Sequence, residues 1–162
     1  GVGKTTLAGE LIGDKGAIIS FADPIKQMAR HILLALGCKP AVKWLSIWKE
    51  RQVPGLPAGI TPRVMLQLIG TELGRNLLDP DIWVKAGMGK AKPVWKKGGI
   101  VVFDDVRFEN EARAIKELDG EIWLIQRKGY SPPLDSHISE KGLPLSLIDK
   151  KHWVKYEDDQ NI

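Results

Sequence analysis

The sequence predicts a three-layer α/β domain, in which a mainly parallel sheet is covered by helices on both faces. Strand-like and helix-like segments alternate along the chain, the order typical of parallel sheets with right-handed crossovers. The strand-like segments, such as residues 100–103, are continuous apolar runs, which indicates strands buried on both faces. The chain also opens on a glycine-rich turn that leads into a helical pattern.

The helices and strands can be placed by their start signals and periodicity. Asp-Pro or Thr-Pro pairs begin three of the helices, because proline suits the first helical position. Residues 54–59 form a loop, and residues 128–147 are too rich in Pro, Ser, Gly and Asp for a simple connection, so we expect a mobile lid there. Helices are predicted at 7–12, 24–36, 41–51, 62–78, 80–90 and 108–118, and strands at 17–21, 100–103, 122–125 and 153–156.

The composition indicates one domain with an anionic partner. The chain has 162 residues, of which 43% are hydrophobic, enough for one core and too few for two comfortable ones. Lys and Arg exceed Asp and Glu by 24 to 20, and the excess is scattered, which favours an anionic ligand over a nucleic-acid surface. Its single cysteine, Cys38, fits a reducing compartment. With no apolar run of about 18 residues and no signal peptide, we expect a cytoplasmic protein without a membrane partner.

The first six residues, Gly1-Val2-Gly3-Lys4-Thr5-Thr6, match the second half of a phosphate-binding loop. Glycines let successive backbone N–H groups point at phosphate oxygens, and the following helix adds its positive amino-terminal end. Lys4 would reach the β and γ phosphates of ATP, and the Thr5 hydroxyl would ligate Mg²⁺. The alternative is a glycine-rich turn that caps an ordinary helix.

Such a loop follows a buried strand, and both that strand and the first glycine of the motif would lie upstream of Gly1. We therefore expect a domain over residues 1–162 that is truncated at its amino terminus and lacks its first strand.

The predicted helix at 62–78 has an apolar and a polar face. At 100° per residue, Met65, Leu66, Ile69, Leu73 and Leu77 share one side. The opposite side carries arginines that are either solvated or, beside a phosphate loop, able to hold an anionic acceptor. These polar residues are Arg63, Gln67, Thr71 and Arg75.

The strand at 100–103 ends in Asp104-Asp105-Val106-Arg107. ATPases that hydrolyse usually place a glutamate directly after the strand-terminal aspartate, and here Asp105 follows Asp104. The pattern Asp105-Val106-Arg107 instead resembles the Asp-x-Arg of small-molecule P-loop kinases, in which the acid organises Mg²⁺ or its waters and the arginine holds a phosphate. In a parallel α/β sheet, ligands bind at the carboxyl ends of the strands. Four candidate residues fall there: Asp23, Asp105, Arg107 and Arg127.

Five stretches in order along the chain resemble the bacteriophage-type deoxynucleoside monophosphate kinase family. The most specific are Asp-Val-Arg-Phe-Glu-Asn-Glu-Ala at 105–112 and Gln-Leu-Ile-Gly-Thr-Glu at 67–72; the others lie at 20–26, 81–83 and 137–143. The resemblance implies a P-loop kinase fold with a lid insertion, and transfer of the γ-phosphoryl of ATP to a deoxynucleoside monophosphate with Mg²⁺. Animal phosphomevalonate kinases resemble the chain more distantly.

The resemblance also implies roles for individual residues. Lys4, Arg107 and Arg127 would act on the transferring phosphoryl, with Arg127 at the start of the lid, while His137, Ser139 and Glu140 match the lid motif. The triphosphate loop is matched by Gly1, Val2, Gly3, Lys4, Thr5 and Thr6, and the acceptor side by Asp23, Lys26, Arg63, Gln67, Arg75, Trp83, Asp105 and Arg107.

Several alternatives stay open. Lys26 and Arg63 are candidates for solvated helix residues, and Asp23 for a simple helix cap. The acceptor could instead be phosphomevalonate or dephospho-coenzyme A. A nucleic-acid-associated ATPase is favoured only by the basic pI, near 9.2, and the six tryptophans, and we expect no stable nucleic-acid partner. A homodimer is compatible with the sequence, and the preferred base is not determined by it.

Overall fold

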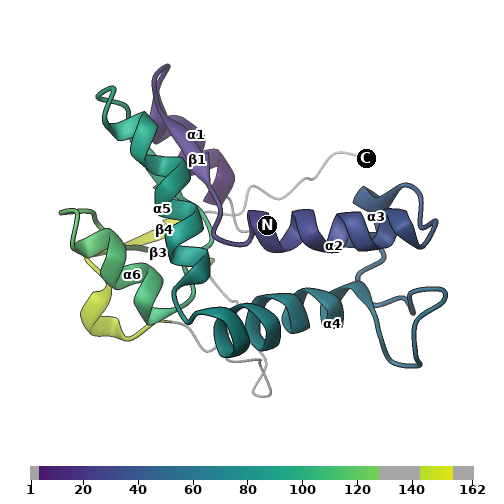
Figure 1. Ribbon diagram of the computed structural model, residues 1–162. Helices are drawn as coiled ribbons and strands as arrows, with labels where there is room; N and C mark the ends of the chain where they lie inside the picture. Colours follow the sequence, from purple (N-terminus) through teal and green to yellow (C-terminus); the bar gives the residue numbers. More distant parts are fainter. Residues whose placement is uncertain (1–3, 128–142, 155–162) are drawn as a thin grey trace, which may run out of the picture. The chain divides into compact units, whose positions relative to one another are not determined.

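The computed structural model describes residues 4–127 and 143–154, and they fall into two compact units (Figure 1). The first unit, which we call the sheet unit, combines Gly1–Ile19 with Ala91–Ile162. The second, the helical unit, is the continuous stretch Ser20–Lys90. Within the described residues, no helix is long and apolar enough to cross a membrane.

The strands of the sheet unit form two parallel pairs. β1 (Ala17–Ile19) pairs with β2 (Val101–Phe103), and β3 (Trp123–Arg127) pairs with β4 (Lys150–Val154). The prediction of parallel pairing is therefore confirmed. In the described part of the chain the strands make two separate two-stranded ribbons, and β4 begins three residues earlier than predicted.

Among the described residues, two α-helices belong wholly to the sheet unit. α1 (Lys4–Ile12) contacts both β1 and β2, and after a turn at residues 13–15 the chain passes through Gly16 into β1. A Cβ on Gly16 would lie 2.7 Å from the Ile100 carbonyl oxygen, so this close approach requires glycine. α6 (Glu109–Lys116) is followed by a turn that reaches the predicted stop at Asp119-Gly120, where Asp119 has φ of 57° and the Gly120 N–H donates to the Ile115 carbonyl at 3.0 Å. The helix itself ends two residues earlier than predicted.

The helical unit is built from four helices and the beginning of a fifth. They are α2 (Asp23–Ala35), α3 (Ala41–Ser46), α4 (Pro62–Gln67), η1 (Leu68–Leu78) and α5 (Ile82–Trp95). α2 and α4 lie side by side, with α3 near the carboxyl-terminal half of α2 (Figure 1). Their facing sides enclose one apolar cluster: Ile25, Ala29, Leu33, Cys38, Ala41, Val53, Met65, Ile69 and Trp83.

The helix predicted at 62–78 changes its geometry halfway. Thr61 caps it, as predicted, by accepting a hydrogen bond from the Val64 N–H at 3.3 Å. From Leu68 onward the helix is a π-helix with i→i+5 hydrogen bonds, so the 100° spacing no longer holds. Met65 and Ile69 are buried as expected, but Leu73 is 37% exposed and Leu77 is 75% exposed, and the predicted place of these two leucines in the core is wrong.

Other predicted boundaries shift by a few residues. α2 begins at Asp23 itself, with Ala22 at the cap position, and α3 ends at Ser46 rather than near 51. α5 begins at Ile82 rather than Pro80 and continues through Pro93. Helix ends depend on which backbone groups find partners nearby, which periodicity does not reveal.

Candidate functional site

The start of α1 carries the predicted phosphate loop. Lys4, Thr5 and Thr6 form its first turn, so a helix does follow the Gly-Val-Gly sequence directly. Gly1, Val2 and Gly3 lie outside the described residues. A helix that begins at Lys4 has its free N–H groups and its positive end at that terminus, which is what the predicted phosphate loop requires. The individual roles assigned to these six residues stay predictions.

The carboxyl end of β2 carries the Asp105-Val106-Arg107 sequence. The Asp104 N–H donates to the Ile19 carbonyl at 3.3 Å, which extends the alignment of β1 with β2 by one residue. Asp105 is half-buried and Arg107 is exposed. Both candidates therefore follow the end of a parallel strand, the location predicted for ligand contacts in this class of fold.

Glu111 braces the backbone beside Arg107. Its carboxylate is 2% exposed and accepts hydrogen bonds from the N–H groups of Arg107, at 2.9 Å, and Phe108, at 3.1 Å. A carboxylate that receives two backbone N–H groups holds the turn between β2 and α6 in one conformation. Sequence reasoning missed this role, although a glutamate at the third position of a helix is a known signal for bonding back to the helix start.

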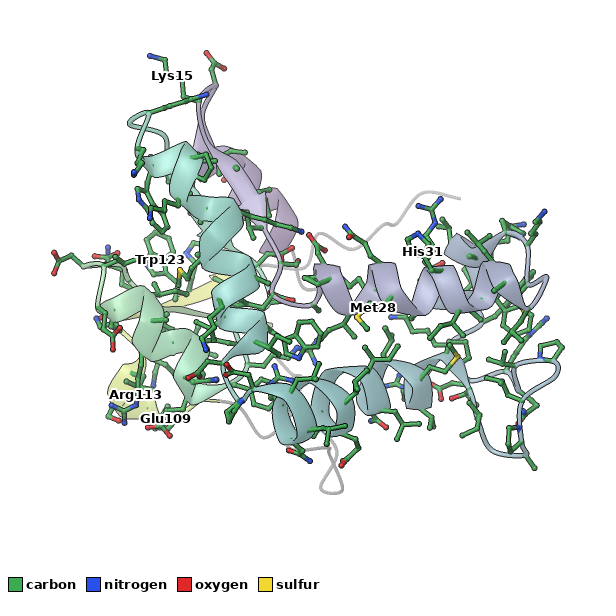
Figure 2. The ribbon with its side chains drawn as sticks, in the orientation of Figure 1. Lys15, Met28, His31, Glu109, Arg113 and Trp123 are labelled. Atoms are coloured by element: carbon green, nitrogen blue, oxygen red, sulfur yellow. The ribbon has the colours of Figure 1, made fainter. Side chains whose placement is uncertain are left out.

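Glu109 on the same helix has a different partner. It forms an ion pair with Arg113 one turn along α6, and the two side chains lie next to each other in Figure 2. Both are exposed. The partner of Glu109 is therefore Arg113 on its own helix.

Arg127 is the last residue of β3, so it lies at the carboxyl end of its strand as predicted. The chain from 128 to 142 is outside the described residues, and with it most of the predicted lid and the motif residues His137, Ser139 and Glu140. Of the stretch assigned to the lid, the described part contains a short 3₁₀ helix, Leu145–Leu147.

Asp23 and Lys26 lie together on the first turn of α2. Lys26 Nζ is 3.7 Å from Asp23 Oδ1, and the two side chains are 52% and 42% exposed. The cap position is Ala22, and no side-chain hydrogen bond caps this helix, so Asp23 does not serve as its cap. A weak, solvated ion pair of this kind leaves the lysine able to turn toward an anionic ligand at little cost.

Arg63 and Arg75 differ in their surroundings within the helical unit. Arg63 forms an ion pair with Glu50, and both groups are solvent-exposed. The Arg75 Nη1 donates to the Gly70 carbonyl at 3.0 Å, and its side chain is half-buried. Because the π-helix intervenes, these arginines do not form the regular polar face that an α-helix would present. Gln67, the last residue of α4, is half-buried.

Trp83 is buried against the π-helix. Its indole is 5% exposed, and its Nε1 donates to the Gly70 carbonyl at 2.7 Å, so one oxygen accepts from both Trp83 and Arg75. A Cβ on Gly74 would lie 2.7 Å from the Trp83 Nε1, so only glycine admits the indole there. The place of Trp83 on the acceptor side stays a prediction; its side chain belongs to the apolar cluster of the helical unit, and its hydrogen bond is to the helix that carries Arg75.

A hydrogen bond and an ion pair of Asp79 connect the loop before Trp83 to α5. Asp79 accepts a hydrogen bond from the Asp81 N–H at 2.7 Å and forms an ion pair with Lys85. The Lys85 hydrogen bond, with the Asp81 N–H second, lowers the pKa of Asp79, and the same pair raises the pKa of Lys85. Both partners are therefore charged at neutral pH and tie the start of α5 to the end of η1.

The described residues contain no group of three or more His, Cys, Asp or Glu side chains that could hold a metal by themselves. Mg²⁺ in nucleotide sites needs only one or two carboxylates, because phosphates and waters complete its coordination. The two consecutive acids after β2, Asp104 and Asp105, fit that limited requirement.

Comparison with known proteins identifies relatives of this chain. A family model described as deoxynucleotide monophosphate kinase matches residues 53–159. A protein of Acanthamoeba polyphaga mimivirus, assigned by name as a deoxynucleotide monophosphate kinase, is 35% identical over 173 residues, covering 93% of this chain and 84% of the relative. A deoxynucleoside-5'-monophosphate kinase of Escherichia phage T5 is 34% identical over 113 residues, covering 64% of this chain and 43% of the phage protein. The chain thus aligns with most of the mimivirus protein and less than half of the phage protein.

Proposed function

This chain belongs to the deoxynucleotide monophosphate kinase family, and we propose that it transfers the γ-phosphoryl group of ATP to a deoxynucleoside 5'-monophosphate, giving the diphosphate and ADP. Membership of the family confirms the resemblance drawn from the sequence motifs. The structural observation that supports the proposal most is the sequence Asp105-Val106-Arg107 at the end of β2. The buried Glu111 carboxylate holds this segment by accepting hydrogen bonds from the backbone N–H groups of Arg107 and Phe108.

The donor half of the proposed site belongs to the sheet unit. The backbone N–H groups of Gly1 to Thr6 and the amino-terminal end of α1 would surround the triphosphate, and Lys4 would neutralise its terminal phosphates. Thr5 would ligate Mg²⁺, and Asp105 would hold the ion or one of its waters. The ion would contribute charge stabilisation on the phosphoryl oxygens.

The acceptor half belongs to the helical unit. Arg75 is the strongest candidate for the acceptor phosphate, because its guanidinium is half-buried and held at a fixed place by the Gly70 carbonyl. A planar guanidinium makes paired hydrogen bonds to phosphate oxygens, and partial burial strengthens them. Further charge and hydrogen bonds to the acceptor would come from Lys26, Arg63 and Gln67. Before they bind the acceptor, Lys26 would leave its surface ion pair with Asp23, and Arg63 would leave its pair with Glu50.

The chemical step needs positioning and charge neutralisation more than covalent help. Arg107, at the end of β2, and Arg127, at the end of β3, would hold the phosphoryl group between donor and acceptor oxygens. An arginine directed at the transferring group stabilises charge as it develops, which is the largest protein contribution to phosphoryl transfer. The stretch at 128–147 would exclude water, so that ATP is not hydrolysed.

A panel of acceptors tests the proposed activity. ATP consumption and product formation are measured with Mg²⁺ and each of the four deoxynucleoside monophosphates, with phosphomevalonate, with dephospho-coenzyme A and with single-stranded DNA. We expect a deoxynucleoside diphosphate from at least one monophosphate, in an amount equal to the ADP formed. Turnover only with phosphomevalonate or dephospho-coenzyme A would move the assignment to another acceptor, and ADP formation that requires DNA would reject it.

A further inference from the structure

The loop that joins α3 to α4 in Figure 1 is built around one side chain, that of Gln52. The Gln52 Nε2 donates to three main-chain carbonyls, those of Val53 at 3.1 Å, Leu56 at 3.2 Å and Pro57 at 2.9 Å. Its Oε1 accepts a hydrogen bond from the Gly59 N–H at 2.8 Å. Both ends of the side-chain amide therefore bind the main chain of one loop.

The main chain of this loop is anchored where it leaves and rejoins the core. The Val53 N–H donates to the Ile60 carbonyl at 2.9 Å, which closes the loop. Val53 is 0% exposed within the apolar cluster of the helical unit, and Ile60 packs against that cluster. Most residues between these two anchors are exposed. The hydrogen bonds of Gln52 therefore supplement burial in fixing the conformation of the loop.

The loop ends at the first turn of α4, which carries Arg63. Thr61 caps this helix, and Arg63 follows two residues later. The Arg63 N–H donates to the Lys49 carbonyl at 3.1 Å, and the Arg63 side chain forms its ion pair with Glu50. Both partners lie just before Gln52 in the sequence. The segment that ends at Gln52 thus holds the main chain and the side chain of Arg63, as well as the loop that leads to it.

These contacts determine how freely the Arg63 guanidinium can move. The first N–H groups of a helix have no partner within the helix, and in α4 the Lys49 carbonyl accepts one of them. A side chain on a helix start that is fixed in this way loses less conformational entropy when it binds a ligand. A guanidinium held in place also presents its planar group to a phosphate at a defined position.

We propose that Gln52 is a positioning residue for the acceptor phosphate. By ordering residues 53–60, it keeps the first turn of α4, and with it the Arg63 guanidinium, where the phosphate of the deoxynucleoside monophosphate binds. Glu50 holds the guanidinium until the acceptor phosphate replaces its carboxylate. This role rests on the proposed function and adds to it a residue that acts through Arg63. Of the proposed acceptor-side residues, Arg63 is the one that directly follows this loop.

A double-mutant cycle tests whether Gln52 acts through Arg63. Steady-state kinetics compares the unchanged chain with Gln52→Ala, with Arg63→Ala and with the double variant, using the best acceptor of the panel. Gln52→Ala should raise the KM for the monophosphate roughly threefold to tenfold, while the KM for ATP stays within about twofold. In the Arg63→Ala chain, adding Gln52→Ala should change the acceptor KM by less than about twofold.

A merely structural role for Gln52 predicts a different pattern. Loss of stability alone would affect the two substrates alike, and its effect would add to that of Arg63→Ala, so either pattern would overturn the proposal. Gln27→Ala, which truncates an exposed glutamine of α2, is the matched control and should leave both KM values unchanged. Should Gln52→Ala fold poorly, Gln52→Glu keeps the side-chain length and the acceptor for the Gly59 N–H but cannot donate to the three carbonyls. That variant must raise the acceptor KM as well.

Amide hydrogen exchange without nucleotide tests the structural step separately. In Gln52→Ala, the amides of Gly59 and Arg63 should exchange at least about tenfold faster, while those of α5 should not change. Unchanged exchange at Arg63 would overturn the proposal. An unchanged chain that phosphorylates none of the acceptors would reject the proposed function together with this role. Normal phosphoryl transfer with the same acceptor KM in the Gln52→Ala chain would reject the role of Gln52 alone.

Discussion

The indole nitrogen of Trp83 donates a 2.7 Å hydrogen bond to the Gly70 carbonyl, across the π-helix that carries Arg75. The same oxygen accepts from the Arg75 guanidinium at 3.0 Å. A buried aromatic side chain on α5 and the candidate phosphate-binding arginine therefore share one acceptor. The position of Arg75 depends on how tightly Trp83 packs against Gly70 and Gly74.

Substitution of Gly74 tests this packing. Gly74→Ala adds a Cβ that overlaps the Trp83 indole, lying 2.7 Å from its Nε1, and we expect a loss of about 1–3 kcal/mol in the free energy of unfolding, as for overpacked cores. Gly89→Ala on α5 is the matched control, since nothing lies within 4 Å of its added Cβ. That control should gain up to about 1 kcal/mol from helix propensity. Urea unfolding of both variants provides the comparison, and equal stabilisation by the two would contradict the packing.

Arg75→Ala tests the acceptor half of the site. Removing one charge-assisted contact of about 1.5–3 kcal/mol should raise the KM for the deoxynucleoside monophosphate by roughly tenfold to a hundredfold, while the KM for ATP stays within about twofold. Arg113→Ala, on α6 and paired with Glu109, is the control and should leave both constants unchanged. Steady-state kinetics with each substrate varied in turn separates the two effects. An unchanged acceptor KM would remove Arg75 from the site.

Lys4→Ala tests the donor half. Loss of the ammonium group that we propose neutralises the terminal phosphates should lower kcat by at least about a hundredfold with little change in the urea midpoint. Lys15→Ala, an exposed lysine between α1 and β1, should behave like the unchanged chain. Near-normal turnover of the Lys4 variant would be incompatible with a phosphate loop at this position.

Glu111→Ala tests the brace beside Arg107. The substitution leaves two backbone N–H groups without their acceptor in a site that is 2% exposed, which should cost about 1–3 kcal/mol of stability and lower kcat through displacement of Arg107. Glu109→Ala removes only the exposed pair with Arg113 and should cost less than about 1 kcal/mol. Glu111→Gln keeps one oxygen as an acceptor and should recover part of the lost turnover. The same kcat in all three variants would mean that the brace does not act on Arg107.

Asp149 provides a pH-dependent contribution to the sheet unit. The Ile122 N–H, at 2.7 Å, and the Lys116 ammonium, at 2.6 Å, lower the pKa of the Asp149 carboxyl below its ordinary value of 3.8. Because the folded pKa is the lower one, the stabilisation is complete above pH 3.8 and is lost as the pH falls through the folded pKa. Asp149→Asn should therefore lower the urea midpoint at neutral pH, with the difference from the unchanged chain shrinking in stronger acid. Asp14→Asn is the exposed control, and a difference that persists undiminished below the folded pKa would contradict this origin.

Local chemistry in the sequence determined most of the elements and the family. The Thr61 cap, the Asp119-Gly120 stop and the apolar strand at 100–103 depend on groups within a few residues of one another, and the structure contains all three. The motifs at 67–72 and 105–112 likewise led to the family that the comparisons confirm. Residues close in sequence were sufficient for each of these predictions.

Features that depend on contacts between residues far apart in the sequence could be found only in the tertiary structure. The change from α- to π-helix at Leu68 accompanies the burial of Trp83 against Gly70 and Gly74. The spacing of apolar residues within 62–78 does not predict this change of helix type. Among the residues that the structure describes, the strands divide into two ribbons because β1 pairs with β2 and β3 pairs with β4. Apolar runs show that a strand will be buried, but its neighbours are chosen by main-chain hydrogen bonds between segments far apart in the sequence.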